Sequence, residues 1–273
     1  MKIKSLSVPL LVCWLTAFVF IPLLIIVIAS FLEQGEFSLF QFTFTLENYK
    51  ELFSPLFLKI LIRSITIGFT VTFLCLIVAL PFCFLVVKSR IKLLLLLLII
   101  IPFWTSSLIR TYALIALLKS HGLINTILLK LHLISTPLNL LYTNTAVMIG
   151  LVYNLLPFMI LPLYAAMERF DFKLIDAAKD LGANSAKIIF KVLIPSIMPG
   201  IISGCILVLL PAMTLFYIPS ILGGARSILL GNLIQQQVYV LENLPQGAAS
   251  SMILTILLLL LMLFYKQQSR GQP

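Results

Sequence analysis

Long apolar stretches alternate with short polar ones along the chain. Six windows contain no Asp, Glu, Lys or Arg: residues 5–32, 64–87, 93–109, 131–167, 192–225 and 243–265. A membrane-spanning helix needs about 20 consecutive apolar residues. The third window is short, but its span can extend past Arg110, which we expect near the membrane interface. The pattern predicts spans at about 8–31, 62–87, 93–115, 144–167, 197–220 and 248–265, in one domain of residues 1–273.

The composition agrees with this pattern. Of the 273 residues, 61% are hydrophobic and only 10% are charged. A soluble domain of this size has no way to bury so much apolar surface. We therefore expect an all-α membrane protein with six transmembrane helices and no separate soluble domain.

The distribution of Lys and Arg predicts the orientation. If both termini share one side, that side holds twelve of the 19 basic residues and the other side holds seven. With four and five acids, the two sides carry +8 and +2 of the net charge of +10. Positive residues concentrate on the cytoplasmic side, so both termini are expected there. No basic run with interleaved aromatics suggests nucleic-acid binding.

The N-terminus also has some features of a secretory signal. Lys2 and Lys4 form a basic start, and residues 27–29 could pass for a cleavage site. However, the apolar run at 6–32 is longer than a typical signal core. We favour an uncleaved first span.

Several kinds of chemistry are absent from the sequence. There is no G-x-x-x-x-G-K-[ST] phosphate loop and no G-x-S-x-G or H-E-x-x-H motif. The spacings of the four cysteines and two histidines match no metal site. No Asp or Glu lies in a predicted span, although secondary transporters and pumps usually keep ionisable groups there. The chain is therefore not expected to be an enzyme by itself, to bind a metal or cofactor, or to supply its own energy.

The polar segment at 168–196 is the most distinctive. A first apolar stripe repeats at i, i+3, i+4 and i+7: Leu174, Ala177, Ala178 and Leu181. A second one follows: Ala186, Ile189, Phe190 and Leu193. Asp171 and Asn184 can cap two short helices, and Gly182 can take the left-handed conformation that ends the first. The pattern predicts helix, glycine bend and helix; an amphipathic loop on the membrane surface is an equal alternative.

The fifth span contains two prolines eight residues apart. Pro211 and Pro219 are followed by Gly223 and Gly224. Proline removes a helical hydrogen bond, and a broken span near the midplane is a common place for a transport site. A purely structural kink is the alternative.

The segment at 168–196 resembles the "EAA" loop of ABC-importer permeases. The pattern is Glu-Ala-Ala, three residues, Gly, nine residues and Ile-x-Leu-Pro. The residues at the matching positions are Asp176, Ala177, Ala178, Gly182 and Pro195. The departures are Asp176 for Glu, Val192 for Ile and Ile194 for Leu. The resemblance implies that this loop docks into a cleft of a separate ATPase subunit and transmits its motion.

Residues from about 10 to 265 resemble the first permease of bacterial spermidine/putrescine importers, within the type I importer family. The segments that carry the resemblance are residues 44–49, 102–110, 150–153, 156–159, 210–213 and 216–217. It implies a polyamine permease of the bacterial inner membrane. The implied partners are a second homologous permease, two ATPase copies that bind ATP and Mg, and a periplasmic binding protein.

Two other functions are kept as alternatives. A permease for another small solute, such as an inorganic anion, is disfavoured because no Arg or Lys is expected deep in a span. A secondary carrier without ATP would leave the EAA-like loop unexplained.

A polyamine is costly to desolvate, so its path needs compensating groups. Aromatic faces attract ammonium groups, and neutral polar groups can accept their hydrogen bonds. The candidate path residues are Tyr153, Asn154, Pro211, Phe216 and Tyr217, with acids supplied by the second permease. Plain helix packing is an equal alternative for each of the side chains.

Overall fold

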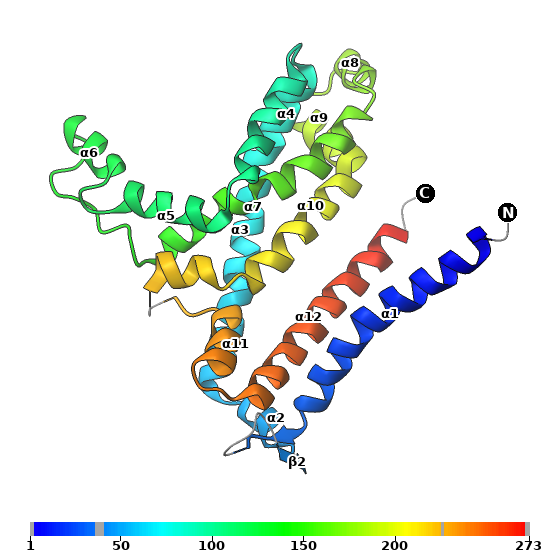
Figure 1. Cartoon of the computed structure of the whole chain (residues 1–273). Helices are drawn as coiled ribbons and strands as arrows, with labels where there is room; N and C mark the ends of the chain where they lie inside the picture. Colours follow the sequence, from blue (N-terminus) through cyan, green and yellow to red (C-terminus); the bar gives the residue numbers. More distant parts are fainter. Residues whose placement is uncertain (1–2, 36–40, 225–226, 271–273) are drawn as a thin grey trace. The chain divides into compact units, whose positions relative to one another are not determined.

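The computed structural model describes residues 3–35, 41–224 and 227–270 (Figure 1). Lys2, Glu36 and Arg226, which entered the charge count, lie outside these ranges. The described chain is almost entirely helical. Its elements are α1 (Ile3–Ala29), β1 (Leu32–Glu33), β2 (Gln41–Phe44), α2 (Glu47–Glu51), α3 (Pro55–Lys88), α4 (Lys92–Ile100), the 3₁₀ turn η1 (Ile101–Trp104), α5 (Ser107–Leu118), α6 (Leu123–Lys130), α7 (Asn144–Glu168), α8 (Lys173–Asp180), α9 (Ser185–Ile188), the π-turn η2 (Ile189–Leu193), α10 (Ile194–Thr214), the π-turn η3 (Pro219–Gly223), α11 (Leu230–Tyr239) and α12 (Leu244–Arg270).

Six helical segments of the described ranges are long and apolar enough to cross a membrane. They are Leu11–Ala29, Pro55–Lys88, Ser107–Lys130, Asn144–Glu168, Ser185–Thr214 and Leu244–Leu263. Lys92–Trp104 is a shorter apolar helix. The expectation of an all-α membrane protein with six spanning helices is confirmed.

The third expected span, 93–115, is not one helix. It is divided between α4, η1 and α5, and the break lies at Thr105, whose ψ of 150° is extended. Pro102 lacks a backbone N–H, and the Thr105 hydroxyl donates to the Pro102 carbonyl at 2.6 Å. Hydropathy averaged over a window does not detect such a break. This explains why the predicted bounds of the third span, 93–115, were wrong.

The fifth expected span, 197–220, also has different bounds. The chain is helical from Ser185 through α9, η2 and α10 to Thr214, so the second half of the polar segment runs directly into the span. The helix ends because Leu215 adopts an extended ψ of 118°. The expected break between Pro211 and Pro219 is therefore present, at residues 215–216.

The chain divides into two compact units. Unit 1 comprises Met1–Ile60 and Leu233–Leu261, and unit 2 comprises Leu61–Asn232 and Met262–Pro273.

In unit 1, α2 is fastened to the end of α1. The Asn48 side-chain amide donates to the carbonyls of Ser30 and Leu32, at 3.2 and 2.9 Å. The hydroxyls of Ser30 and Tyr49 lie 2.8 Å apart, and the Phe31 ring packs on Tyr49. These contacts give residues 44–49 a structural role at the end of the first span.

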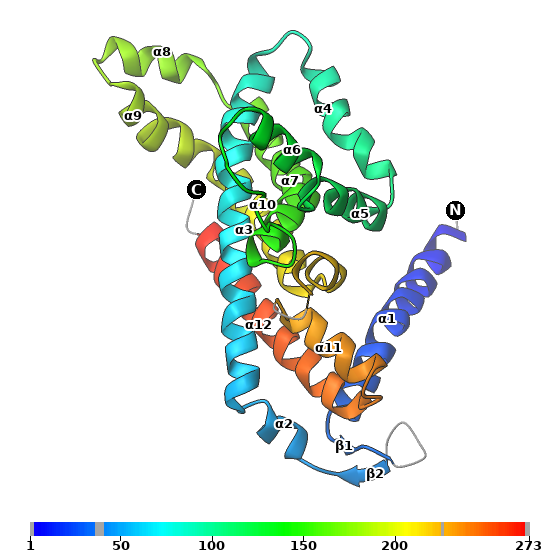
Figure 2. The same ribbon diagram turned by 90° about the vertical axis from the view of Figure 1, so that its left-hand side faces the viewer.

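In unit 2, α7 and α10 pack closely along most of their length. Gly200 and Gly204 face α7: a Cβ at Gly200 would lie 2.4 Å from the Ala166 Cβ, and one at Gly204 would lie 2.6 Å from the Met159 sulfur. Small residues let membrane helices approach each other in this way. The helices α8 and α9 form a hairpin where α3 ends and α4 begins (Figures 1 and 2).

Candidate coupling loop and transport path

The first short helix of the polar segment ends near Gly182, as the sequence predicts. Gly182 has a φ of 77° and follows Leu181, the C-cap residue of α8. Its N–H donates to the carbonyl of Lys179 at 2.8 Å, and the N–H of Ala183 donates to the carbonyl of Ala178 at 2.9 Å. This pair of bonds is the Schellman motif, which satisfies the last carbonyls of a helix. No heavy atom would lie within 4 Å of a Cβ at Gly182.

The second helix begins at its expected cap. The Asn184 side-chain oxygen accepts a hydrogen bond from the N–H of Lys187 at 2.9 Å. The Asp171 carboxylate likewise accepts from the N–H of Lys173 at 3.0 Å, before α8. Pro195 lies in the first turn of α10. It therefore sits inside the continuous helix and not in a loop.

The two apolar stripes are only partly buried. Ile175 and Ile188 are buried on the inner side of the hairpin, with Ala178 and Leu193 beside them. The other stripe residues are exposed: Leu174, Ala177, Leu181, Ala186, Ile189 and Phe190. Leu181 is 89% exposed and Phe190 69%. The hairpin therefore presents an apolar edge that unit 2 leaves uncovered.

Aromatic and cationic contacts anchor the hairpin to the ends of the spanning helices. Phe172, just before α8, packs against Phe84 of α3 and Phe170, with ring centroids 6.2 and 5.3 Å away. The Lys88 ammonium lies 4.2 Å from the Phe84 centroid and 5.5 Å from that of Phe172. No sequence spacing pointed to this cluster, because its members come from two distant segments.

A second anchor joins α4 to α7. The Lys92 ammonium lies 2.7 Å from the Glu168 carboxylate, which also accepts from the Tyr164 hydroxyl at 2.8 Å. The short loop between α3 and α4 is therefore anchored at both ends, by Lys88 at its start and by Lys92 at its end.

One of the two expected path residues of α7, Tyr153, lies near a buried cation. Tyr153 is partly exposed, whereas Asn154 is 3% exposed and its side-chain oxygen has no hydrogen-bond partner. The Arg110 guanidinium lies 4.4 Å from the Phe103 ring centroid and 6.0 Å from that of Tyr153. Arg110 is 9% exposed, and its Nε has no hydrogen-bond partner.

Arg110 packs against the first half of α7. Tyr153 is nine residues into α7, which places it about 14 Å from the start of this helix at 1.5 Å per residue. The expectation that Arg110 lies near the membrane interface stays a prediction. The break at Thr105 turns α5 so that its arginine packs against α7.

The break after α10 holds the remaining path residues. Pro211 lies in the last turn of α10, and its carbonyl accepts from the N–H of Leu215 at 2.8 Å. The rings of Phe216 and Tyr217 meet edge-on, with centroids 6.1 Å apart. Phe216 is partly exposed, while Tyr217 packs on the core of unit 2.

The break also contacts α7 one turn before Tyr153. A Cβ at Gly150 would lie 2.9 Å from a methyl group of Ile218, the neighbour of Tyr217. The Asn232 side chain donates to the Phe216 carbonyl at 2.6 Å and fixes the unwound backbone. Sequence reasoning missed Asn232, whose only signal is an amide just beyond a broken span.

In the part of the chain that the structure describes, no group of three His, Cys, Asp or Glu residues is arranged to hold a metal ion.

Comparison with known proteins gives a consistent picture. Residues 72–270 match the family described as "Binding-protein-dependent transport system inner membrane component". The spermidine/putrescine transport system permease protein PotB of Haemophilus influenzae is 44% identical over 253 residues, covering 92% of this chain and 88% of that protein. PotB of Escherichia coli is 45% identical over 262 residues, covering 95% of each.

A solved structure shares the fold. One chain of the crystal structure of a bacterial alginate ABC transporter, in complex with an alginate pentasaccharide-bound periplasmic protein, matches with a TM-score of 0.78. The match covers 99% of this chain and 94% of that one, at 15% identity. The six spanning helices therefore have the fold of an ABC transporter permease.

Proposed function

Because the chain belongs to the family of binding-protein-dependent transport system inner membrane components, we propose that it is the permease subunit of an ATP-driven polyamine importer. The observation that carries the substrate class is near-full-length identity of 44–45% to relatives named as spermidine/putrescine permeases. The chain is a multi-pass protein of the inner membrane and is not itself a catalyst.

The proposed machine divides the work among subunits. Two copies of an ATPase bind ATP and Mg, a second homologous permease completes the pathway, and a periplasmic binding protein delivers the substrate. The sequence supports this division because it contains no phosphate loop. Both termini and the α8–α9 hairpin lie in the cytoplasm in this arrangement.

The α8–α9 hairpin is the proposed ATPase contact. Asp176 and Ala177 are exposed on α8, and Leu181 and Phe190 extend the same uncovered apolar edge. Exposed apolar side chains of this kind gain free energy when a partner covers them. The Phe172 and Lys88 anchor would carry a movement of the hairpin to the end of α3.

The break after α10 is the proposed polyamine contact. Phe216 and Tyr217 offer aromatic faces, and the unpaired Asn154 oxygen is an acceptor in the neighbouring helix α7. Aromatic faces attract ammonium groups by up to about 2 kcal/mol when water is excluded. Pro211 helps to end α10 close to Phe216. Tyr153, on α7, is proposed to line the substrate path. Carboxylates for charge compensation would come from the second permease.

Arg110 gives one reason to keep a second candidate function. A buried guanidinium with an unpaired Nε would suit an anionic solute. Against this, its face is covered by Phe103, and the substrate named for the relatives is cationic. We therefore assign Arg110 to the helix packing of α5 on α7.

Reconstitution tests the proposal. The chain is purified with the second permease and the ATPase, placed in proteoliposomes, and supplied with binding protein and radiolabelled spermidine. We expect saturable, ATP-dependent uptake that needs every subunit. Uptake by this chain alone, or uptake of phosphate or sulfate in place of spermidine, would contradict the proposal.

A further inference from the structure

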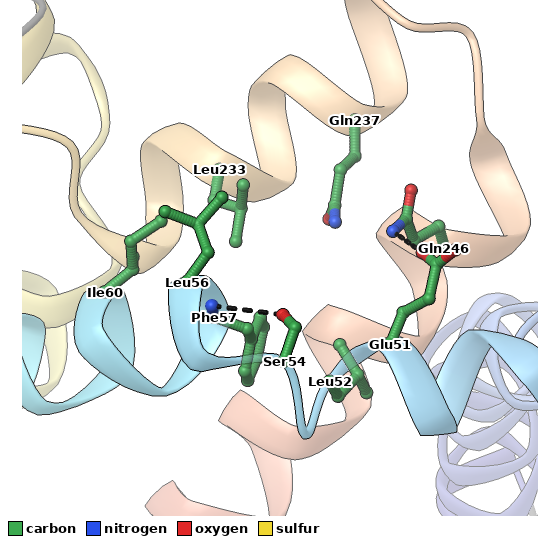
Figure 3. A pocket seen from close by; sticks show the side chains of 9 residues that line it. All are labelled: Glu51, Leu52, Ser54, Leu56, Phe57, Ile60, Leu233, Gln237 and Gln246. Atoms are coloured by element: carbon green, nitrogen blue, oxygen red, sulfur yellow. Dashed lines mark hydrogen bonds between the residues drawn. The ribbon is translucent and has the colours of Figure 1, made fainter.

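Unit 1 contains a small cavity (Figure 3). It lies between the end of α2, the start of α3, α11 and the start of α12, and its volume is about 180 Å³. Nine residues line it: Glu51, Leu52, Ser54, Leu56, Phe57, Ile60, Leu233, Gln237 and Gln246. Holding one water takes only about 10–15 Å³ of such volume, so a group of several non-hydrogen atoms fits.

One end of the cavity is rich in oxygen acceptors. The Glu51 carboxylate accepts a hydrogen bond from the Gln246 amide and retains further lone pairs. The Ser54 hydroxyl oxygen lies 3.3 Å from the N–H of Phe57. Gln237 is 4% exposed, points into the space, and is held by the Ser250 hydroxyl at 2.8 Å.

The other end is apolar. Figure 3 shows Leu56, Ile60 and Leu233 on the side away from Glu51 and Gln246. The buried Phe57 side chain lies near Ser54, between the two ends. A ligand with a cationic head and a methylene tail matches this polarity, because an ammonium group has three donors and no acceptor.

The charge distribution favours a cation at this cavity. Among the described residues, all four acids that the proposed topology places outside the membrane belong to unit 1: Glu33, Glu47, Glu51 and Glu242. In the described part of the chain, only Lys50 and Lys59 oppose them in the outer part of unit 1, whereas the outer part of unit 2 carries four basic residues and no acid. A surface of one charge sign raises the local concentration of the opposite ion.

We propose that this cavity is an alkylammonium site at the outer face, which receives one aminoalkyl end of the polyamine. The inference rests on the proposed polyamine import. The Glu51 carboxylate pairs with the terminal ammonium, and the oxygens of Ser54 and Gln237 accept its other N–H groups. The adjoining methylenes lie along Ile60 and Leu233. The permease thus offers the substrate a charged contact before it reaches the path within the membrane.

Equilibrium binding of radiolabelled putrescine to the assembled transporter in nanodiscs, without binding protein, tests the site. Glu51→Gln keeps the shape of the side chain and its bond to Gln246 but removes the charge. We expect this variant to bind about tenfold more weakly, equivalent to about 1.4 kcal/mol. Glu47→Gln is the matched control, because Glu47 lies on the same helix but does not line the cavity. It removes the same charge from the surroundings but not the direct contact, so it should weaken binding far less than Glu51→Gln does.

Leu233→Trp fills the apolar end without a change of charge, and we expect a similar loss of binding. Wild-type affinity in both variants, or undetectable binding by a wild type that imports spermidine with its binding protein, would overturn this site and leave the proposed function standing. A wild-type complex that neither binds nor imports polyamines would overturn both. The two failures are therefore distinguishable.

Discussion

Gly182 is held in a backbone conformation that few other residues tolerate. Its φ of 77° closes the Schellman motif, and a β-branched residue in the left-handed region costs about 1–2 kcal/mol or more. We expect Gly182→Val to lose most polyamine uptake while the protein still inserts in the membrane. The measurement is uptake in cells, with membrane content determined by immunoblot.

Gly182→Asn is the matched control for this change, because asparagine visits the left-handed region readily. The space around a Cβ is open, so the side chain itself meets no obstacle within unit 2. We expect Asn to retain much more uptake than Val. Equal activity of the two variants would show that the turn geometry is not required for coupling.

The aromatic pair at the break after α10 supports a second prediction. Replacing Phe216 and Tyr217 together by Leu keeps bulk but removes both π faces, each worth up to about 2 kcal/mol to a desolvated ammonium. We expect spermidine uptake to fall at least tenfold, with assembly and basal ATP hydrolysis unchanged. Phe73→Leu, on the exposed side of α3, is the control. Uptake equal to the wild type at all spermidine concentrations would refute the aromatic contact.

At the scale of single residues, the sequence predicted backbone conformations better than it predicted which side chains lie next to one another. The bend at Gly182 and the cap at Asn184 follow from local chemistry, and both are present. The burial of Arg110 depends on a turn of α5 that brings it against Tyr153, a residue 43 positions away. Long-range contacts of this kind leave no signal in the spacing of residues.

Among the elements, α7 was predicted almost to the residue and the third span was not. The window before Glu168 is bounded by a charge at one end and by Pro137 and Asn139 at the other, so its limits are visible. The window at 93–109 contains Pro102, but eight of the nine prolines that fall in the predicted spans lie within helices or π-turns of the structure. Proline alone therefore does not show which helix breaks.

The anchor between α3 and the α8–α9 hairpin gives an element-scale prediction. Phe172→Ala removes the ring that meets Phe84 and Lys88. If this contact carries movement from the hairpin to α3, the ATPase will still dock and hydrolyse ATP, but transport will follow less often. We expect the number of spermidine molecules imported per ATP to fall several-fold.

Phe172→Tyr keeps the ring and should keep the ratio of transport to hydrolysis, so it separates loss of the contact from any change at this position. Parallel loss of hydrolysis and uptake in Phe172→Ala would instead mean that the contact only stabilises the hairpin. A stability role would also lower the yield of assembled complex, which size-exclusion chromatography measures.

At the scale of the whole molecule, orientation rests on the distribution of charge and on the position of the hairpin. The proposed cytoplasmic side holds twelve of 19 Lys and Arg residues, and a difference of this size commonly fixes topology. A direct chemical measurement tests this orientation.

Two exposed leucines on opposite sides provide it. In a variant whose four native cysteines are replaced by alanine, Leu181→Cys lies at the end of α8 and Leu133→Cys lies between α6 and α7. A membrane-impermeant maleimide added to intact spheroplasts should label position 133 and leave 181 unlabelled, and inverted vesicles should give the reverse. The opposite pattern would place the α8–α9 hairpin outside the cell, where no ATPase could reach it, and would remove the basis of the proposed coupling.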